Sequence, residues 1–249
     1  MGITSRPGRL TQERRRFGRG NFDLECALSG LDPRFITFDM YGTLTDFAIG
    51  SAAREVVKDV APPDRLDAFL HRFSCYQLDE VMGDWRPYDE VVSRSFERAC
   101  RSTGVEFRPG DPDKIFAAIP GWGPHPDVPG PLAELAEHFP LVIISNAADR
   151  HADQNVAKLG ASFHAVYTAE MARAYKPRLR AFEFMYEQLG CRPEETMHVS
   201  SSPRYDLQSA TDLGVKDTVY LNRGTEPSAP YYHAYEVTSL AGVVELLGI

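Results

Sequence analysis

The sequence predicts an α/β protein with a doubly wound, Rossmann-like parallel sheet and an inserted helical cap. From Phe35 onwards, short apolar runs alternate with longer amphipathic stretches, which is typical of a parallel sheet covered by helices. About a hundred residues between the first two runs contain no comparable strand. The length of 249 residues is enough for one core domain that carries an inserted lobe.

Apolar runs mark the candidate strands of this sheet. They are FITFD (35–39), LVIISN (141–146), AVYTAE (165–170), MHVSSS (197–202) and TVYLNR (218–223). The stretches 66–82 and 88–104 have apolar residues at helical spacing, so we expect 46–122 to form the cap. A Pro- and Gly-rich linker then leads into a helix that starts near Pro131. The core is expected to comprise 21–45 and 123–249.

Composition and charge argue against several classes of protein. The net charge of -8 argues against nucleic-acid binding, because such domains usually carry a basic face. No apolar run reaches the roughly eighteen residues that a membrane span needs. The N-terminus lacks the apolar segment of a signal peptide. We therefore expect a cytoplasmic protein.

The cysteines and the N-terminal segment suggest no further site. Cys26, Cys75, Cys100 and Cys191 are scattered, with neither the spacing of a zinc site nor that of a disulfide framework. Residues 1–20 contain six arginines and little that can be buried, so they are expected to be a basic, disordered tail.

Polar side chains follow the first four apolar runs. Asp39 ends the first run, Ser145 and Asn146 end the second, Lys176 follows the third after a short loop, and Asp206 follows the fourth. Ligands of an open parallel sheet bind beyond the carboxyl ends of its strands. The residues are therefore expected to meet in one site.

This constellation resembles the haloacid dehalogenase superfamily, from about Phe35 to the C-terminus. FDMYGTLTD matches its first motif, IISN its second, AYKP its third and VSSSPRYD the region of its fourth. Most members are magnesium-dependent phosphatases, so membership alone does not determine the reaction. Those phosphatases have an acid two residues after the nucleophile and another that ligates the metal. Tyr41 and Ser201 stand at these positions here, which removes a proton donor and an anionic metal ligand.

The resemblance is closest to the type II (S)-2-haloacid dehalogenases, whose first motif likewise reads Asp-x-Tyr-Gly-Thr. It implies metal-independent, cofactor-free hydrolysis of short 2-haloalkanoic acids to 2-hydroxy acids, with inversion, through an ester on Asp39. Lys176 would keep Asp39 ionised, while Thr43 and Ser145 position carboxylate oxygens. Asp206 would orient Lys176 or polarise the attacking water.

The resemblance also implies substrate contacts. Tyr41 would form a pocket wall, Asn146 would donate to the halide, and Ser202 stands where the family tends to have Asn. One extra residue separates Ser202 from Asp206, and Phe182 replaces a tyrosine of the family pattern.

A cap arginine holds the departing halide in those enzymes. Arg72 is the first choice for this role here, and Arg86 or Gln77 remain alternatives.

Two alternatives to a dehalogenase remain open: a phosphatase of the superfamily with an altered metal site, and a non-catalytic member of the fold. The expected partner is a small anionic substrate, with neither nucleic acid nor membrane involved. A homodimer is left open.

Overall fold

The computed structural model describes residues 31–249, so the predicted tail of residues 1–20 lies outside the described residues. One six-stranded sheet has the order β3-β2-β1-β4-β5-β6, and every neighbouring pair is parallel. The strands are β1 (Phe35–Phe38), β2 (Leu141–Ser145), β3 (Ala165–Thr168), β4 (Thr196–Ser200), β5 (Asp217–Leu221) and β6 (Tyr235–Val237). The predicted fold class is confirmed, and β6 is an edge strand that the apolar runs did not indicate.

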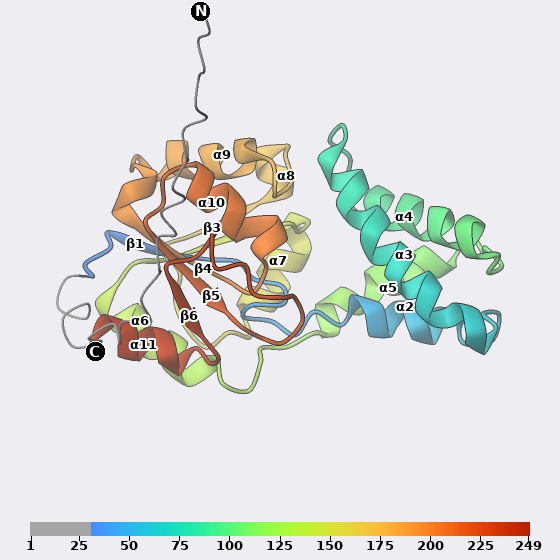
Figure 1. The fold of residues 1–249 in the computed structure, drawn as a ribbon, viewed down its shortest axis with the longest axis horizontal. Coiled ribbons are helices and arrows are strands. Elements are labelled where there is room, and N and C mark those ends of the chain that lie inside the picture. Colours follow the sequence, from blue (N-terminus) through green and yellow to red (C-terminus); the bar gives the residue numbers. More distant parts are fainter. Residues whose placement is uncertain (1–30) are drawn as a thin grey trace, which may run out of the picture.

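Helices cover both faces of this sheet (Figure 1). The helices of the sheet domain are α6 (Pro129–His138), α7 (Asp149–Val156), α8 (Ala169–Ala172), α9 (Leu179–Leu189), α10 (Gln208–Asp212) and α11 (Ala241–Leu247). Side chains of α6, α7 and α11 pack with Ile36 and Phe38 of β1 in one apolar cluster. Side chains of α9 and α10 pack with Phe35 in another. Successive residues of β1 thus face opposite layers, as strand geometry requires.

The segment between β1 and α6 forms a separate group of helices, drawn beside the sheet in Figure 1. It contains α2 (Ile49–Val57), α3 (Pro63–Met82), α4 (Tyr88–Thr103) and α5 (Asp111–Ala118), followed by the short η1 (Ile119–Gly121). The rings of Phe69, Phe73 and Phe96 meet at its centre, with centroids 5.2 to 6.2 Å apart. The buried carboxylate of Glu80 on α3 pairs with Arg94 and Arg98 of α4. This group of helices lies in the segment for which we expect a cap, and it is called the cap below.

Two adjacent segments connect the cap to the core. Thr45 forms an antiparallel bridge with Pro124, and the Asp46 N–H donates to the Gly123 carbonyl at 2.9 Å. The Tyr175 hydroxyl, from the core, donates to the Arg86 carbonyl of the cap at 2.8 Å. The linker helix begins at Pro129, two residues before the predicted start.

Within residues 31–249, no helix has the length and apolar character that crossing a membrane requires.

Candidate active site

The predicted site residues lie where the strands end. Asp39 directly follows β1, and Ser145 is the last residue of β2. Lys176 follows α8, and Asp206 lies in η3 (Pro203–Leu207), shortly after β4. All four side chains belong to residues that are at most 6% exposed. The parallel strands therefore bring them to one edge of the sheet, as predicted.

The ammonium group of Lys176 is the centre of this site. Its Nζ donates to Asp39 Oδ1 at 2.7 Å, to Asp206 Oδ1 at 2.7 Å and to the Ile144 carbonyl at 2.8 Å. These bonds use all three ammonium protons. Lys176 therefore holds both carboxylates at once.

Asn146 holds the main chain of Lys176. The Lys176 N–H donates to Asn146 Oδ1 at 2.7 Å, and Asn146 Nδ2 donates to the Lys176 carbonyl at 2.9 Å. One amide proton of Asn146 remains for a ligand, and the residue lines the cavity described below. The structure thus adds a supporting role to the halide contact predicted for Asn146.

Burial and charge shift the acid–base properties of this cluster. Burial raises the pKa of Asp39, and Lys176 and Thr43 oppose that shift. For Asp206, burial also favours the neutral acid, but Lys176 and His198 outweigh it and lower the pKa. Burial disfavours the Lys176 ammonium, yet the two carboxylates raise its pKa. The negative charge of Asp39 therefore depends on Lys176.

The turn after Asp39 holds its second oxygen. Thr43 Oγ1 donates to Asp39 Oδ2 at 2.6 Å and accepts the Ser201 N–H at 2.9 Å. Gly42 adopts a φ of 91°, which an L side chain rarely adopts, and a Cβ there would approach Ser201 Oγ to 3.4 Å. Both oxygens of the Asp39 carboxylate are thus hydrogen-bonded, one to Lys176 and one to Thr43.

The extra residue of the fourth motif is accommodated by a π-helical turn. Residues Pro203–Leu207 form η3, in which the Leu207 N–H donates to the Ser202 carbonyl five residues earlier, at 3.3 Å. A π turn accommodates one residue more than an α turn. Asp206 therefore reaches Lys176 despite the longer spacing. Ser202 is the N-cap of this turn, and its Oγ accepts the Tyr205 N–H.

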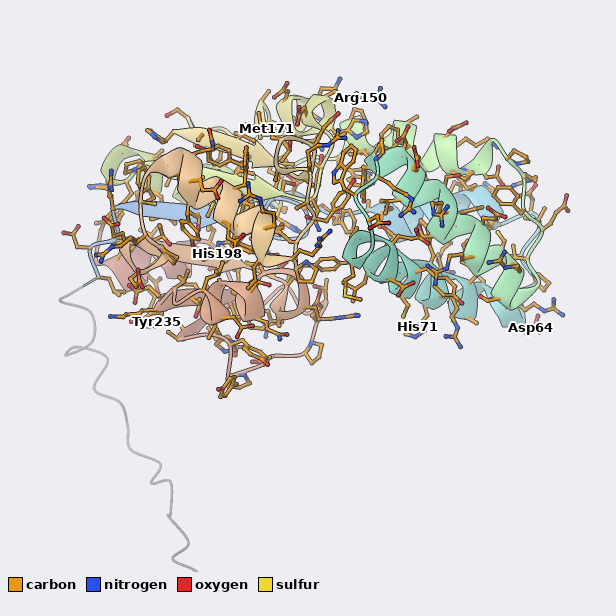
Figure 2. All side chains as sticks on the ribbon, turned by 90° about the horizontal axis from the view of Figure 1, so that it is seen from above. Asp64, His71, Arg150, Met171, His198 and Tyr235 are labelled. Atoms are coloured by element: carbon orange, nitrogen blue, oxygen red, sulfur yellow. The ribbon has the colours of Figure 1, made fainter. Side chains whose placement is uncertain are left out.

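Sequence reasoning missed His198. Its Nε2 lies 3.2 Å from Asp206 Oδ1, and its Nδ1 lies 2.8 Å from Thr37 Oγ1. The signal in the sequence was a polar residue between the apolar Met197 and Val199 of a predicted buried strand. Figure 2 shows His198 among the strands and helices of the core, whereas His71 and Asp64 mark the cap.

A cavity of about 450 Å³ opens over the Asp39 carboxylate. The core residues that line it include Asp39, Tyr41, Ser145, Asn146, Lys176, Ser201, Ser202 and Asp206, together with His125, Arg204, Tyr205 and Glu226. From the cap it is lined by Leu70, Phe73, Ser74, Gln77, Val81 and Tyr88. The cap thus contributes a mainly apolar wall opposite a polar one, an arrangement suited to a small ligand with a charged end.

Arg72, the first choice for the halide contact, is not among the residues that line this cavity. Arg72 is exposed on α3. The residues of α3 that do line the cavity recur at helical spacing, from Leu70 through Phe73 and Gln77, and Arg72 lies off that stripe. Of the two alternatives, Arg86 is also absent from the wall, whereas Gln77 belongs to it. The arginine that does line the cavity is Arg204, from η3 of the core.

Tyr41 forms part of the wall, and its hydroxyl is hydrogen-bonded to residues of α7. Its Oη accepts from Asn155 Nδ2 at 3.0 Å, and its ring packs near Phe47 and Trp122. Burial raises the pKa of this phenol. Tyr41 is therefore poorly suited to deliver a proton at the site.

Two serines at the strand ends differ in their partners. Ser202 Oγ donates to Glu226 Oε1 at 2.8 Å, and burial raises the pKa of that glutamate. Ser145 Oγ is buried without a hydrogen-bond partner among the described residues. Ser145 consequently keeps a free donor beside the cavity.

The residues present do not fit a resident divalent cation. Ser201 offers a neutral hydroxyl where hard cations prefer carboxylates. Asp206 Oδ1 is already shared by Lys176 and His198. Within the described part of the chain, no three His, Cys, Asp or Glu side chains gather in a way that would hold a metal.

Comparison with known proteins places this geometry in a family. The model for haloacid dehalogenase-like hydrolases matches residues 33–214. The (S)-2-haloacid dehalogenase 4A of Burkholderia cepacia is 28% identical over 224 residues, which cover 86% of this chain and 94% of the relative. The (S)-2-haloacid dehalogenase of Xanthobacter autotrophicus is 30% identical over 191 residues, covering 72% and 71%. A crystal structure of a dehalogenase with an intermediate complex has a TM-score of 0.74 at 26% identity, covering 88% of this chain and all of that one.

The family match spans well over half of the chain and includes Asp39, Ser145, Lys176 and Asp206. The chain is therefore a hydrolase that belongs to the haloacid dehalogenase-like family.

Proposed function

We propose that the protein hydrolyses short 2-haloalkanoic acids to 2-hydroxy acids through an ester on Asp39. The observation that carries the proposal is the Asp39 carboxylate, which faces the cavity with both oxygens held by Lys176 and Thr43. Tyr41 and Ser201 stand where a phosphatase would need acids. The names of the relatives from Burkholderia cepacia and Xanthobacter autotrophicus support the same substrate class.

The first half of the reaction is a displacement at carbon. An oxygen of the Asp39 carboxylate bonds to the carbon that bears the halogen, and the halide leaves from the opposite side with the bonding electron pair. A halide departs without a proton, so the reaction tolerates Tyr41 at this position. Attack from the opposite side inverts the configuration of that carbon.

Donors around the cavity suit the anionic ends of such a substrate. The free hydroxyl of Ser145 and the remaining amide proton of Asn146 are placed to bind its carboxylate or the departing halide. Arg204 supplies a positive charge on the cavity wall, and we assign to it the halide contact first expected of Arg72. Leu70 and Phe73 of the cap enclose the alkyl part.

The second half is hydrolysis of the ester. Water attacks the carboxyl carbon of Asp39, and the Lys176 ammonium opposes the negative charge that develops on the carbonyl oxygen. Asp206 Oδ1 accepts from Lys176, whereas Oδ2 is buried and has no partner among the described residues. Oδ2 is therefore the oxygen that polarises the water. The substrate carbon is untouched in this step, so a single inversion remains in the product.

Halide release from chloroacetate and 2-chloropropionate, measured with EDTA present, tests the activity. A single turnover in heavy-oxygen water should place the label in Asp39 and leave the first product unlabelled. Asp39→Asn should abolish turnover, while Asp46→Asn, an exposed acid on the same cavity wall, should retain most of it.

Three outcomes would contradict the proposal. Label in the first product would mean that water attacks the substrate directly. An S substrate that gave an S product would exclude a single displacement. Phosphate release from phosphoesters without halide release from any haloacid would favour the phosphatase alternative.

A further inference from the structure

The buried His198 has no role in the reaction described so far. His198 is 0% exposed, and it lies opposite Thr37 in the register of β4 with β1. The ring of Phe182, from α9, stands nearly perpendicular to the imidazole, with centroids 5.5 Å apart. Both imidazole nitrogens have polar partners, Asp206 and Thr37. Side chains from β1, α9 and η3 thus contact the imidazole ring.

The partners assign the proton on each nitrogen. The ionised Asp206 carboxylate can only accept, so His198 Nε2 carries a proton and donates it. The Thr37 hydroxyl lies 2.8 Å from Nδ1 and 3.1 Å from the Met197 carbonyl. Donation of its single proton along the shorter contact satisfies Nδ1 without a second proton on the ring. Thr37 therefore favours the tautomer in which His198 donates to Asp206.

The consequence for Asp206 is an asymmetric carboxylate. Oδ1 accepts from Lys176 Nζ and from His198 Nε2, whereas Oδ2 accepts from no described residue. With a single donor, the carboxylate is free to turn about its Cβ–Cγ bond and exchange its oxygens. Two donors from different elements on one oxygen restrain that rotation. The lone pairs of Oδ2 are thereby kept free for a proton, as a general base requires.

We propose that His198 is a positioning residue for ester hydrolysis: it holds Asp206 so that Oδ2 takes the proton of the attacking water. The inference rests on the proposed aspartyl-ester function. As the water oxygen bonds to the Asp39 carboxyl carbon, its proton passes to Asp206 Oδ2. The ester C–O bond then breaks, and the departing oxygen of the 2-hydroxy acid takes that proton. Halide displacement by Asp39 transfers no proton and does not require His198.

His198→Phe separates the two halves of the reaction. Phenylalanine keeps a planar ring beside Phe182 but has no donor for Asp206. With 2-chloropropionate, rapid-quench measurement should show the first equivalent of halide released at the wild-type rate. Steady-state turnover should then fall about 10- to 100-fold, by analogy with the loss of partners that orient metal-ligating side chains. Intact-protein mass spectrometry should show the ester accumulating.

Two further variants complete the test. His198→Gln keeps an N–H donor at the end of the side chain and should restore much of the turnover. Thr37→Val removes the partner of Nδ1 and should slow the steady state less than His198→Phe, again with the first halide release unchanged. If His198→Phe does not fold, this effect of Thr37→Val decides the matter.

Equal slowing of the first turnover and the steady state would overturn the inference, as would an unchanged steady state in His198→Phe, or in Thr37→Val where that variant decides. Wild-type protein that released no halide would refute the proposed function itself and this inference with it. Halide release by wild-type protein with no ester accumulation in the variants would overturn only the role of His198.

Discussion

Replacing Lys176 by methionine perturbs the central ion cluster most directly. Methionine is similar in length but uncharged, so two buried carboxylates lose their shared donor. Their Oδ1 atoms are at most 5.4 Å apart, twice the 2.7 Å from Nζ to each. The repulsion between the two carboxylates at that separation is about 3 kcal/mol, or about two pKa units, at an effective dielectric constant of about 20, and it is present in the wild type as well. The variant loses the attraction of the Lys176 ammonium for Asp39, which at 2.7 Å is about 6 kcal/mol at the same dielectric constant and so exceeds that repulsion. We therefore expect the pKa of Asp39 in Lys176→Met to rise by at least about two units.

A pH series of halide release measures this shift. Because only ionised Asp39 attacks, the pH range over which the first-turnover rate rises should move to higher pH by at least about two units. Urea unfolding should show a loss of about 3–5 kcal/mol, as expected when one partner of a buried ion pair is removed. In the variant the folded protein binds protons more tightly than the unfolded chain. Its stability therefore falls as pH rises, and the loss should shrink in acid.

Two further variants serve as controls for the Lys176→Met prediction. Lys216 is an exposed lysine, and Lys216→Met should measurably change neither the pH dependence of the first-turnover rate nor the free energy of unfolding. Adding Asp206→Asn to Lys176→Met should restore part of the stability, because one of the two repelling charges is gone. The reasoning is refuted if Lys176→Met resembles Lys216→Met, or if its stability loss grows in acid.

Other expected outcomes test the remaining parts of the site. In the wild type, burial raises the pKa of Asp39, so the first-turnover rate should increase with pH around a midpoint above the ordinary 3.8; a midpoint at or below that value contradicts the buried nucleophile. Arg204→Ala should raise KM for 2-chloropropionate about tenfold through loss of a charged contact, while Arg72→Ala should stay within about a factor of two, as expected of a surface position; the reverse order would return the halide contact to the cap. Exhaustive chelation should leave turnover unchanged, and recovery on adding magnesium after a loss would contradict the absence of a metal role. Glu80→Gln should lower the melting temperature without changing KM, because Glu80 joins α3 to α4 away from the cavity; a changed KM with an unchanged melting temperature would contradict that role.

The sequence was most informative where local pattern determines position. Five strands were predicted because buried strands of a parallel sheet are nearly continuous apolar runs. Asp39, Ser145 and Asp206 could be placed because each follows such a run closely along the chain. The edge strand β6 was missed, since its three residues, Tyr235–Val237, include the exposed Glu236.

The residues of the cavity wall and those beneath the site were harder to identify from the sequence, because their positions depend on contacts between distant segments. The helical spacing of Phe69, Phe73 and Val81 already indicates the inward face of α3 and leaves Arg72 off it. Which arginine enters the cavity depends on how the chain turns after β4, which the spacing of the fourth motif did not reveal. His198 meets Thr37 only through the register of two strands separated by more than 150 residues. Such pairing has no local signature in a single sequence.

The π turn in Pro203–Leu207 bears on how motifs of this kind should be compared between proteins. A π turn accommodates one additional residue within the helix. The residues before and after it can therefore keep the same positions in space although their spacing in the sequence is one residue longer. A motif search that requires a fixed residue spacing would miss this chain, although Asp206 contacts the motif lysine, Lys176. Arg204 lies within this turn and lines the cavity wall. The same turn therefore preserves one chemical group and supplies another, and libraries that vary its length are a direct route to altered substrate preference.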